Sequence, residues 1–307
     1  MTGATGGLGR QTARALVARG CPVIIGGRNE AKLDACAEEL ERAGASSVDR
    51  FHADLSDLGA VRAALDAIDA PALSGIVSNA GVSSMQAARS AQDYELTFAV
   101  NVLAPQLILR TLARRLVDGS RVVVVSSGVH DPDNKLARRF GIPIPDWVGT
   151  RNLARPDEAP EFLRQQDGRL RYATSKLGNV LQARGLQSNL DPARGIDVFA
   201  IDPGLMVDTD LAREFPGPAR AILRAVGRML TPFVPNMRLS PESAQHIASL
   251  ILDSEHAGKG FQYFDGADAR PPSPDALRDE LMEDLWTESA PLIGLRIDSS
   301  SLQGVSR

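Results

Sequence analysis

Two residues of the stretch "YATSK" have side chains that could move a proton together. Tyr172 and Lys176 lie four positions apart, so on a helix they share one face. An isolated phenol has a pKa of about 10, and a nearby ammonium stabilises the phenolate and brings that pKa nearer working pH. Such a pair can exchange a proton with an oxygen of a bound molecule. Two surface residues on a helix would show the same spacing, so the pair needs support from elsewhere in the chain.

The stretch "TGATGGLG" runs from Thr2 to Gly9 and is dominated by glycine. Glycine lets the backbone turn sharply and approach a pyrophosphate, whose charge is favoured at the N-terminus of the helix that follows. The stretch therefore predicts a dinucleotide site, although a glycine-rich turn alone is weak evidence.

Helical periodicity and short β-branched runs alternate along most of the chain. Alternation of this kind specifies parallel strands with helices on both faces. We predict one α/β domain over residues 1–307, a doubly wound parallel sheet of the Rossmann type. The pattern lapses at about 128–170 into a Pro-, Asp- and Arg-rich insertion, and an amphipathic helical tail begins at about 270.

Composition excludes some classes of function. The chain has 307 residues, 43% of them apolar, and a formal net charge of −4, which gives no basic footprint for nucleic acid. The four histidines lack metal-like spacing, so we predict no metal site. Cys21 and Cys36 are the only cysteines, and we expect reduced packing residues, which suits a cytoplasmic protein. No apolar run approaches the roughly 20 residues of a membrane span.

Several separate motifs together resemble classical short-chain dehydrogenase/reductases, from Thr2 to about Asp265. They are the glycine turn, "SNAG" at Ser78–Gly81, "VVVVSS" at a strand end and "YATSK". The spacing of the glycines also fits the extended, sugar-nucleotide-modifying branch of the superfamily, but "SNAG" favours the classical one. "SSGVHDPDN" followed by a long insertion, and then "DPGLMVDTDLARE", look like the branch of retinol dehydrogenases and light-dependent protochlorophyllide reductases. Leu205 stands where the light-dependent enzymes carry a cysteine, which favours an ordinary carbonyl reductase or alcohol dehydrogenase.

The resemblance implies a role for each residue of a catalytic set. Tyr172 exchanges the proton, Lys176 holds the cofactor ribose and tunes the phenol, and Ser127 orients the substrate oxygen. Asn101 matches the asparagine that holds a water of the family's proton relay. Ser126 is expected to be packed or bonded to backbone.

The resemblance also implies contacts with a nicotinamide dinucleotide along the whole carboxyl edge of the sheet. Asp54 and Leu55 match the pair that contacts adenine, although Asp54 could instead cap a helix. Arg28 follows Gly26 and Gly27, where relatives that prefer NAD carry an acidic residue, and an arginine there can pair with a 2′-phosphate, so we predict NADP. The remaining predicted cofactor contacts are Gly3, Thr5, Gly7, Leu8, Gly9, Asn79, Ala80, Gly81, Tyr172, Lys176, Pro203, Gly204 and Thr209.

The leading hypothesis is an NADP-dependent oxidoreductase that transfers a hydride between nicotinamide and a carbonyl or secondary alcohol of a small molecule. We expect the insertion to form a wall or lid, and its residues Phe140, Ile142, Ile144 and Trp147 to favour a hydrophobic substrate. A non-catalytic NADP-sensing protein would need the glycine turn but not the tyrosine, lysine and serine. A sugar-nucleotide epimerase would need a further subdomain, which we do not identify. The sequence does not determine the oligomeric state, and a homodimer is one alternative.

The glycine turn begins at the second residue, whereas a central strand normally precedes such a turn. We expect the first strand to be missing, with the natural protein beginning several residues upstream. An alternative is that another segment fills the place of that strand, such as the tail from Asp298, although "DSSSLQGVSR" has poor strand character.

Overall fold

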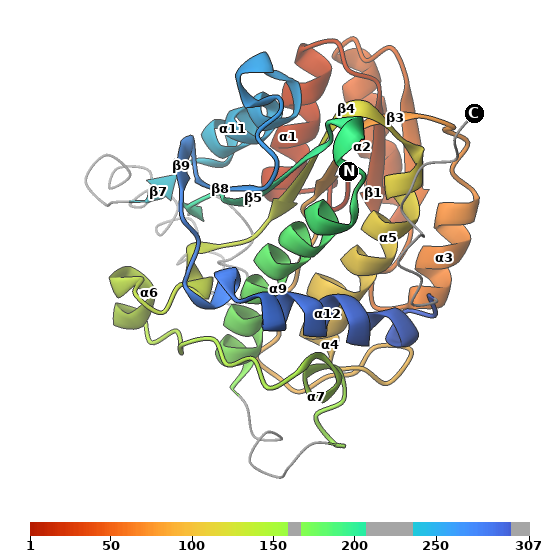
Figure 1. The fold of residues 1–307 in the computed structure, drawn as a ribbon. Coiled ribbons are helices and arrows are strands. Elements are labelled where there is room, and N and C mark those ends of the chain that lie inside the picture. The colour runs from red at the N-terminus through yellow and green to blue at the C-terminus, as the bar shows by residue number, and fades with distance from the viewer. Residues whose placement is uncertain (159–166, 207–235, 296–307) are drawn as a thin grey trace, which may run out of the picture.

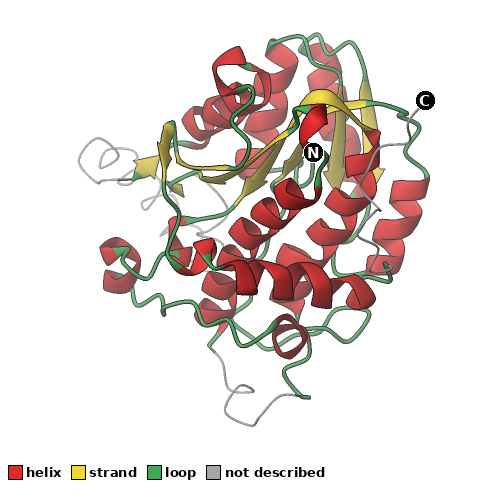
Figure 2. Cartoon of the chain, in the orientation of Figure 1, coloured by secondary structure: helices red, strands yellow, loops and turns green. Residues whose placement is uncertain are grey.

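A mainly parallel sheet carries helices on both of its faces in the computed structural model, which describes residues 1–158, 167–206 and 236–295 (Figures 1 and 2). The strands are β1 (Val23–Gly27), β2 (Val48–His52), β3 (Leu73–Ser78), β4 (Leu116–Val125), β5 (Asp197–Asp202), β6 (Leu205–Met206), β7 (Met237–Arg238), β8 (Gln262–Asp265) and β9 (Asp268–Arg270). The α-helices are α1 (Gly7–Ala18), α2 (Glu30–Arg42), α3 (Leu58–Asp66), α4 (Leu96–Phe98), α5 (Ala104–Leu112), α6 (Lys135–Arg139), α7 (Thr150–Ala154), α9 (Gly168–Asn189), α11 (Ser240–Leu252) and α12 (Asp279–Leu292).

Short turns of other helix types complete the described elements. One is a π-helix, η1 (Ala99–Leu103), which lies between α4 and α5. The others are 3₁₀ turns: η2 (Ala113–Arg115), η3 (Gly128–His130), η4 (Pro192–Arg194), η6 (Ser254–His256) and η7 (Asp275–Leu277). α4 and α5 therefore do not form one continuous α-helix, because a π-helical turn lies between them at Asn101.

The strands pair in the order β3-β4-β5-β8-β9, parallel except for the antiparallel β9, and β1 pairs in parallel with β2. Residues of β4 and β5 point alternately into two apolar layers, as the period of two in a strand requires. Val122 and Val124 join the layer with α3, α5, α9 and α12, whereas Val123 and Val125 join the layer with α1, α2 and α11. Both faces of the sheet are therefore buried, which confirms the doubly wound α/β class.

The junction between β1 and β3 is made by the first two residues. The Met1 amino group donates to the Ile24 carbonyl at 2.6 Å, and the Gly26 amide donates to the Met1 carbonyl at 2.8 Å. On the other side the Thr2 amide donates to the Val77 carbonyl at 3.0 Å. No strand lies between β1 and β3 among the described residues, and the tail from Asp298 falls outside them.

One apolar stretch of the chain approaches the length of a membrane span. Leu96–Arg115 has 20 residues, with a mean hydropathy of 1.4 in a window that is 89% buried inside the protein. The expectation that no run approaches span length was wrong for this stretch. Its apolar side chains pack against the sheet and against α9, so it is a core helix of this fold.

The C-terminal part of the described chain packs against α9. Trp286 of α12 lies against Gly185, and the Arg110 guanidinium sits 4.1 Å from the centre of its ring. Trp286 thus anchors the amphipathic helix α12 on α9. The described start of the insertion, residues 128–158, forms η3, α6 and α7.

Candidate active site

Tyr172 and Lys176 lie on one face of α9, as their spacing predicts. Asp167 caps this helix by accepting from the Arg169 amide at 2.8 Å. The Lys176 Nζ atom lies 5.6 Å from the centre of the Tyr172 ring and donates to the Val125 carbonyl at the end of β4 at 3.2 Å. Lys176 is only 5% exposed, so its ammonium is held by acceptors of the protein rather than by water.

The acid strengths of the pair differ from the expectation. Burial and the carboxylate of Asp202 raise the pKa of Tyr172 to about 12, so the prediction of a lowered phenol pKa was wrong for the protein without cofactor. Burial lowers the pKa of Lys176 to about 8, and Asp202 partly opposes this effect. Desolvation disfavours the charged form of each group. At neutral pH Tyr172 is therefore a proton donor and Lys176 is mainly charged.

The end of β4 brings two serines to the same place. The Ser126 hydroxyl donates to the Lys176 carbonyl at 2.8 Å, which fastens β4 to α9 and confirms the structural role expected for Ser126. Ser127 is half-buried, and its carbonyl lies 2.7 Å from Nδ1 of His130. Within the described residues the Ser127 hydroxyl has no hydrogen-bond partner, so it remains available for a ligand oxygen.

Asn101 lies in the π-helical turn η1 and is 1% exposed. Its side chain accepts from the Val82 amide and donates to the Val82 carbonyl, both at 2.8 Å, and it also donates to the Ser175 hydroxyl at 3.0 Å. The side chain therefore braces the turn after β3 against α9. Its backbone carbonyl accepts a hydrogen bond from Asn179 at 2.6 Å, a contact that sequence reasoning missed.

The glycine turn fits a pyrophosphate. A Cβ on Gly9 would lie 2.0 Å from the Gly3 carbonyl oxygen, and Gly3 has a φ of +69° that other residues rarely adopt. Gly6 caps α1 without any side-chain hydrogen bond, and the first turn, which includes Gly7 and the buried Leu8, has no acidic residue. The free amides at this helix N-terminus are the donors that a phosphate needs.

Two side chains hold the glycine turn in place. The Thr2 hydroxyl accepts from the amides of Asn79 and Ala80, each at 3.0 Å. The Asn79 side chain donates to the Thr2 carbonyl at 3.0 Å and to the Gly3 carbonyl at 3.3 Å. Asn79 thus shapes the turn, and Thr2 shares this function although the sequence analysis assigned it none. Gly81 lies next to Lys176, since a Cβ there would come within 3.6 Å of Lys176 Nζ.

The outer end of the predicted cofactor site is exposed. Arg28 follows β1, and its guanidinium has no hydrogen-bond or ion-pair partner within the described parts of the chain. Asp54 accepts from the Ser56 amide at 2.9 Å and from the Ser56 hydroxyl at 2.7 Å, while Asp57 caps α3. Leu55 is partly buried against the core, and Thr5 lies beside Gly27. The adenine role of Asp54 and Leu55 stays a prediction.

Pro203 and Gly204 follow β5 at the same edge of the sheet. The Pro203 carbonyl accepts from the Ser243 hydroxyl at 2.6 Å, and Gly204 has a φ of +88° with its amide bonded to Asp202 at 2.9 Å. Asp202 is 3% exposed and was not identified from the sequence. Thr209 lies outside the described residues.

Comparison with known proteins decides the family. The family model described as short chain dehydrogenase matches residues 1–135. Dehydrogenase/reductase SDR family member 13 of Bos taurus is 31% identical over 300 residues, which cover 96% of this chain and 72% of that protein. Retinol dehydrogenase 12 of Homo sapiens is 30% identical over 301 residues, which cover 96% of this chain and 86% of that protein. The chain belongs to the short-chain dehydrogenase/reductase family.

The matches to retinol dehydrogenases place it in the retinol-dehydrogenase-like branch of that family. A solved short-chain dehydrogenase from Burkholderia cenocepacia in complex with NADP is 25% identical. It superposes with a TM-score of 0.59 over 87% of this chain and 96% of that one.

This short-chain dehydrogenase/reductase has a cavity of about 510 Å³ that is lined by Gly128, the residue after Ser127, and whose wall carries apolar surface as well as charged side chains. Residues that line it include Gly128, His130, Lys135, Asp202 and Arg270. The start of the insertion therefore forms one wall of this cavity, and its role over a bound substrate stays a prediction.

The four apolar residues of the insertion that were expected to favour a hydrophobic substrate lie outside this cavity. Phe140 and Ile144 are 64% and 55% exposed, Ile142 is half-buried, and Trp147 packs on Phe98 with 6.0 Å between ring centres. None of them lines this cavity, so these residues give the hydrophobic substrate no support from the structure, and it stays a prediction. Trp147 instead donates to Asp284 of α12 at 2.8 Å, which explains its place in the core.

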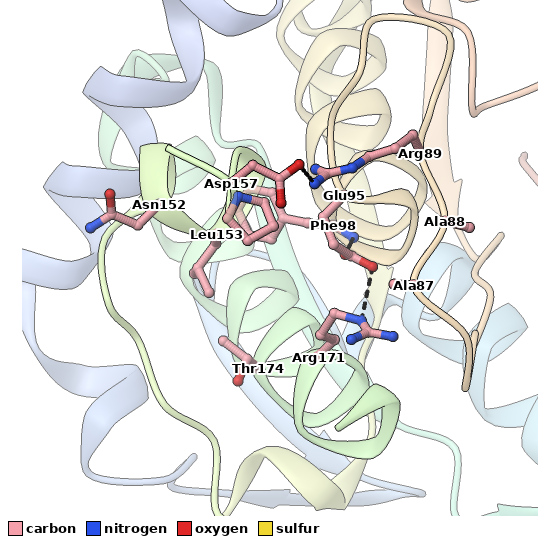
Figure 3. Close-up of a pocket in the computed structure, with 11 residues that line it drawn as sticks. Ala87, Ala88, Arg89, Glu95, Phe98, Asn152, Leu153, Asp157, Arg171 and Thr174 are labelled. Atoms are coloured by element: carbon pink, nitrogen blue, oxygen red, sulfur yellow. Dashed lines mark hydrogen bonds and ion pairs between the residues drawn. The ribbon is translucent and has the colours of Figure 1, made fainter. Parts of the chain in front are cut away.

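A second, smaller cavity of about 70 Å³ lies where the starts of α4 and α9 meet (Figure 3). Arg171 and Glu95 point toward one another across it, with 3.0 Å between Nε and Oε1, and Arg89 pairs with Asp157. Glu95 also caps α4 by accepting from the Phe98 amide at 2.6 Å. This ion pair ties the helix of Tyr172 to the helix of Asn101, so we assign the cavity a structural role.

Proposed function

We propose that this protein is an NADP-dependent oxidoreductase that transfers a hydride between nicotinamide C4 and a carbonyl or secondary alcohol of a small molecule. One observation carries the proposal: α9 holds Tyr172 and a charged, buried Lys176 on one face, with Ser127 at the adjoining end of β4. Proton donor, cation and hydroxyl are the groups that a carbonyl reduction needs besides the hydride.

Each residue of the site has its own part in the reduction of the carbonyl. The bound cofactor supplies the hydride. Tyr172, protonated at neutral pH because of its raised pKa, gives its proton to the oxygen of the carbonyl. The unbonded hydroxyl of Ser127 orients that oxygen, and Lys176 stabilises the phenolate that forms. Asn101 keeps the turn after β3 fixed against α9, so that Gly81 stays beside Lys176.

Arg28 supports the choice of NADP over NAD. An exposed guanidinium without a protein partner can form charge-assisted hydrogen bonds with a 2′-phosphate, whereas no carboxylate stands at the end of β1 for a 2′-hydroxyl. The NADP in the complex from Burkholderia cenocepacia supports the same choice.

Charged side chains in the wall of the larger cavity guide the choice of substrate. We infer a carbonyl compound with hydrogen-bonding groups on the side away from its carbonyl, because groups such as Lys135 and Asp202 would meet them there.

Transfer of label tests the proposal. The protein is incubated with NADPH deuterated at C4 and a panel of ketones and aldehydes, half of them hydroxylated and half apolar, and the alcohols are analysed by mass spectrometry. We expect deuterium at the carbinol carbon, with faster turnover of hydroxylated members, and a large loss in Ser127→Ala. Binding of NADPH without labelled alcohol from any carbonyl would overturn the proposal and favour a sensing role.

A further inference from the structure

Asn179 stands one helical turn after Lys176 on α9, and it is 4% exposed. Its Oδ1 accepts from Lys176 Nζ at 3.2 Å, and its Nδ2 donates to the Asn101 carbonyl at 2.6 Å. A weaker contact of 3.5 Å joins Nδ2 to Gln182. One buried amide therefore connects the catalytic ammonium to the π-helical turn.

The Asn101 carbonyl lacks the donor that an α-helix would give it. In an α-helix the carbonyl would accept from the amide four residues later, but that residue is Pro105, which has no N–H. A buried carbonyl without a donor is costly. The strong bond from Asn179 Nδ2 fills this need, and it fixes the orientation of the amide, so that Oδ1 faces Lys176.

Lys176 has three ammonium donors, and two of them have acceptors in the protein. Val125 provides one carbonyl and Asn179 the other oxygen, each at 3.2 Å. These two acceptors leave the third donor for a ligand or for the Tyr172 side of the site. Tyr172 on α9 and the carboxylate of Asp202 at the end of β5 are the ionisable groups that act on this ammonium.

We propose that Asn179 is a positioning residue of the reaction: it holds the Lys176 ammonium charged and aimed at Tyr172 by linking it to the carbonyl of Asn101. The proposal rests on the proposed function for its effect on rate. The effect on Lys176 itself does not depend on any substrate.

The alternative is that Asn179 only satisfies the Asn101 carbonyl. Both roles predict some loss of stability when Asn179 is replaced, so melting temperature does not separate them. The ionisation of Lys176 does, because only a residue that stabilises the ammonium changes it.

Lysine NMR offers a direct reading. The chain has only four lysines, and the other three, Lys32, Lys135 and Lys259, are exposed. In protein labelled with ¹³C-lysine, the signal with the low titration midpoint is assigned to Lys176 by its absence from Lys176→Arg. We measure that midpoint in wild type, Asn179→Leu, Asn179→Ser and Asn179→Asp.

We expect a lower midpoint in Asn179→Leu and Asn179→Ser, because each loses the Oδ1 atom that accepts from the ammonium, and the shorter serine side chain does not replace it at the same position. Asn179→Asp keeps an oxygen there and should hold the wild-type midpoint or raise it. Reduction should fall by roughly tenfold to a hundredfold in the first two variants, and its decline at high pH should begin at a lower pH. Should Asn179→Leu not fold, Asn179→Ser gives the same comparison with a smaller polar side chain.

Gln106→Leu is the matched control, since it removes another buried side-chain amide, 1% exposed and without a partner among the described residues. It should leave the midpoint of Lys176 unchanged. An unchanged midpoint in Asn179→Leu and Asn179→Ser would overturn the proposal. If wild type reduces no carbonyl, the proposed function fails, while the midpoints still decide the role of Asn179.

Discussion

The polar groups around Lys176 are buried and hydrogen-bonded to one another, whereas the polar groups around Arg28 are exposed at the surface, where a ligand can reach them. Lys176, Asn101 and Asn179 are at most 5% exposed and form a continuous network across two helices. Arg28 and Asp54 lie at the ends of neighbouring strands, in contact with water. The side chains around Lys176 are therefore held in position before any ligand binds. Arg28 and Asp54 are not held in this way, and we expect them to contribute to cofactor binding through their charge.

This difference predicts how strongly each region responds to change. Electrostatic interactions are strong in a water-poor interior and weak at the surface. Substitutions near Lys176 should therefore remove chemistry, and substitutions near Arg28 should weaken binding by a smaller factor.

Tyr172→Phe should give the largest effect. It removes only the transferred proton, so we expect kcat to fall by a thousandfold or more while the Kd of NADPH changes little. Steady-state rates and a fluorescence titration with NADPH measure the two quantities. A variant that keeps near-wild-type rates would mean that another group is the acid.

Gly9→Ala should abolish cofactor binding by geometry rather than by charge. The added Cβ would collide with the Gly3 carbonyl, so the turn must open, and we expect NADPH affinity to fall by at least about a hundredfold. Gly59→Ala, on the exposed first turn of α3, is the control and should bind normally. Equal affinity of both variants would show that the turn does not cradle a phosphate.

Arg28→Asp should have a moderate effect. Losing a charge-assisted contact of about 1.5–3 kcal/mol corresponds to roughly tenfold to a hundredfold weaker NADPH binding, with NADH binding little changed. Arg42→Asp, at an exposed arginine on α2, controls for net charge. Wild-type protein that prefers NADH would contradict the assignment of NADP.

The pH dependence should be gradual. Because burial lowers the pKa of Lys176 to about 8, its charged fraction decreases as pH rises through that value. We expect kcat/KM for NADPH, which reports the free enzyme, to be level near pH 7 and to decline above about pH 8. Tyr172, with a pKa of about 12, stays protonated over this range, and His130, with a pKa below its ordinary value, adds no step there. A profile that stays level to pH 10 would contradict a catalytic ammonium in Lys176.

Local patterns were enough to predict most of the elements and the shared location of the Tyr172–Lys176 pair, whose catalytic role stays a prediction. Tyr172 and Lys176 are four residues apart, which predicts that they share one helix face. Runs of β-branched residues are typical of buried strands, so the strands could be predicted as well. The contact of the Asn101 carbonyl with Asn179 was not visible, because the two residues lie far apart along the chain.

Properties set by burial also escaped sequence reasoning. The raised pKa of Tyr172 depends on desolvation and on Asp202, which only the fold brings near. The apolar residues of the insertion were visible, but not the fact that Trp147 packs inward while Phe140 faces solvent. Tertiary contacts determine which of these side chains are buried, and the local sequence pattern does not show those contacts.

A double-mutant cycle on NADPH binding tests most directly whether the two regions have separate tasks. The Kd of NADPH is measured for wild type, Tyr172→Phe, Arg28→Asp and the double variant. We predict that Arg28→Asp weakens binding by the same factor in both backgrounds, within about 0.5 kcal/mol, and that Tyr172→Phe alone has almost no effect. Loss of affinity in Tyr172→Phe as large as that in Arg28→Asp would contradict this division between chemistry and cofactor binding.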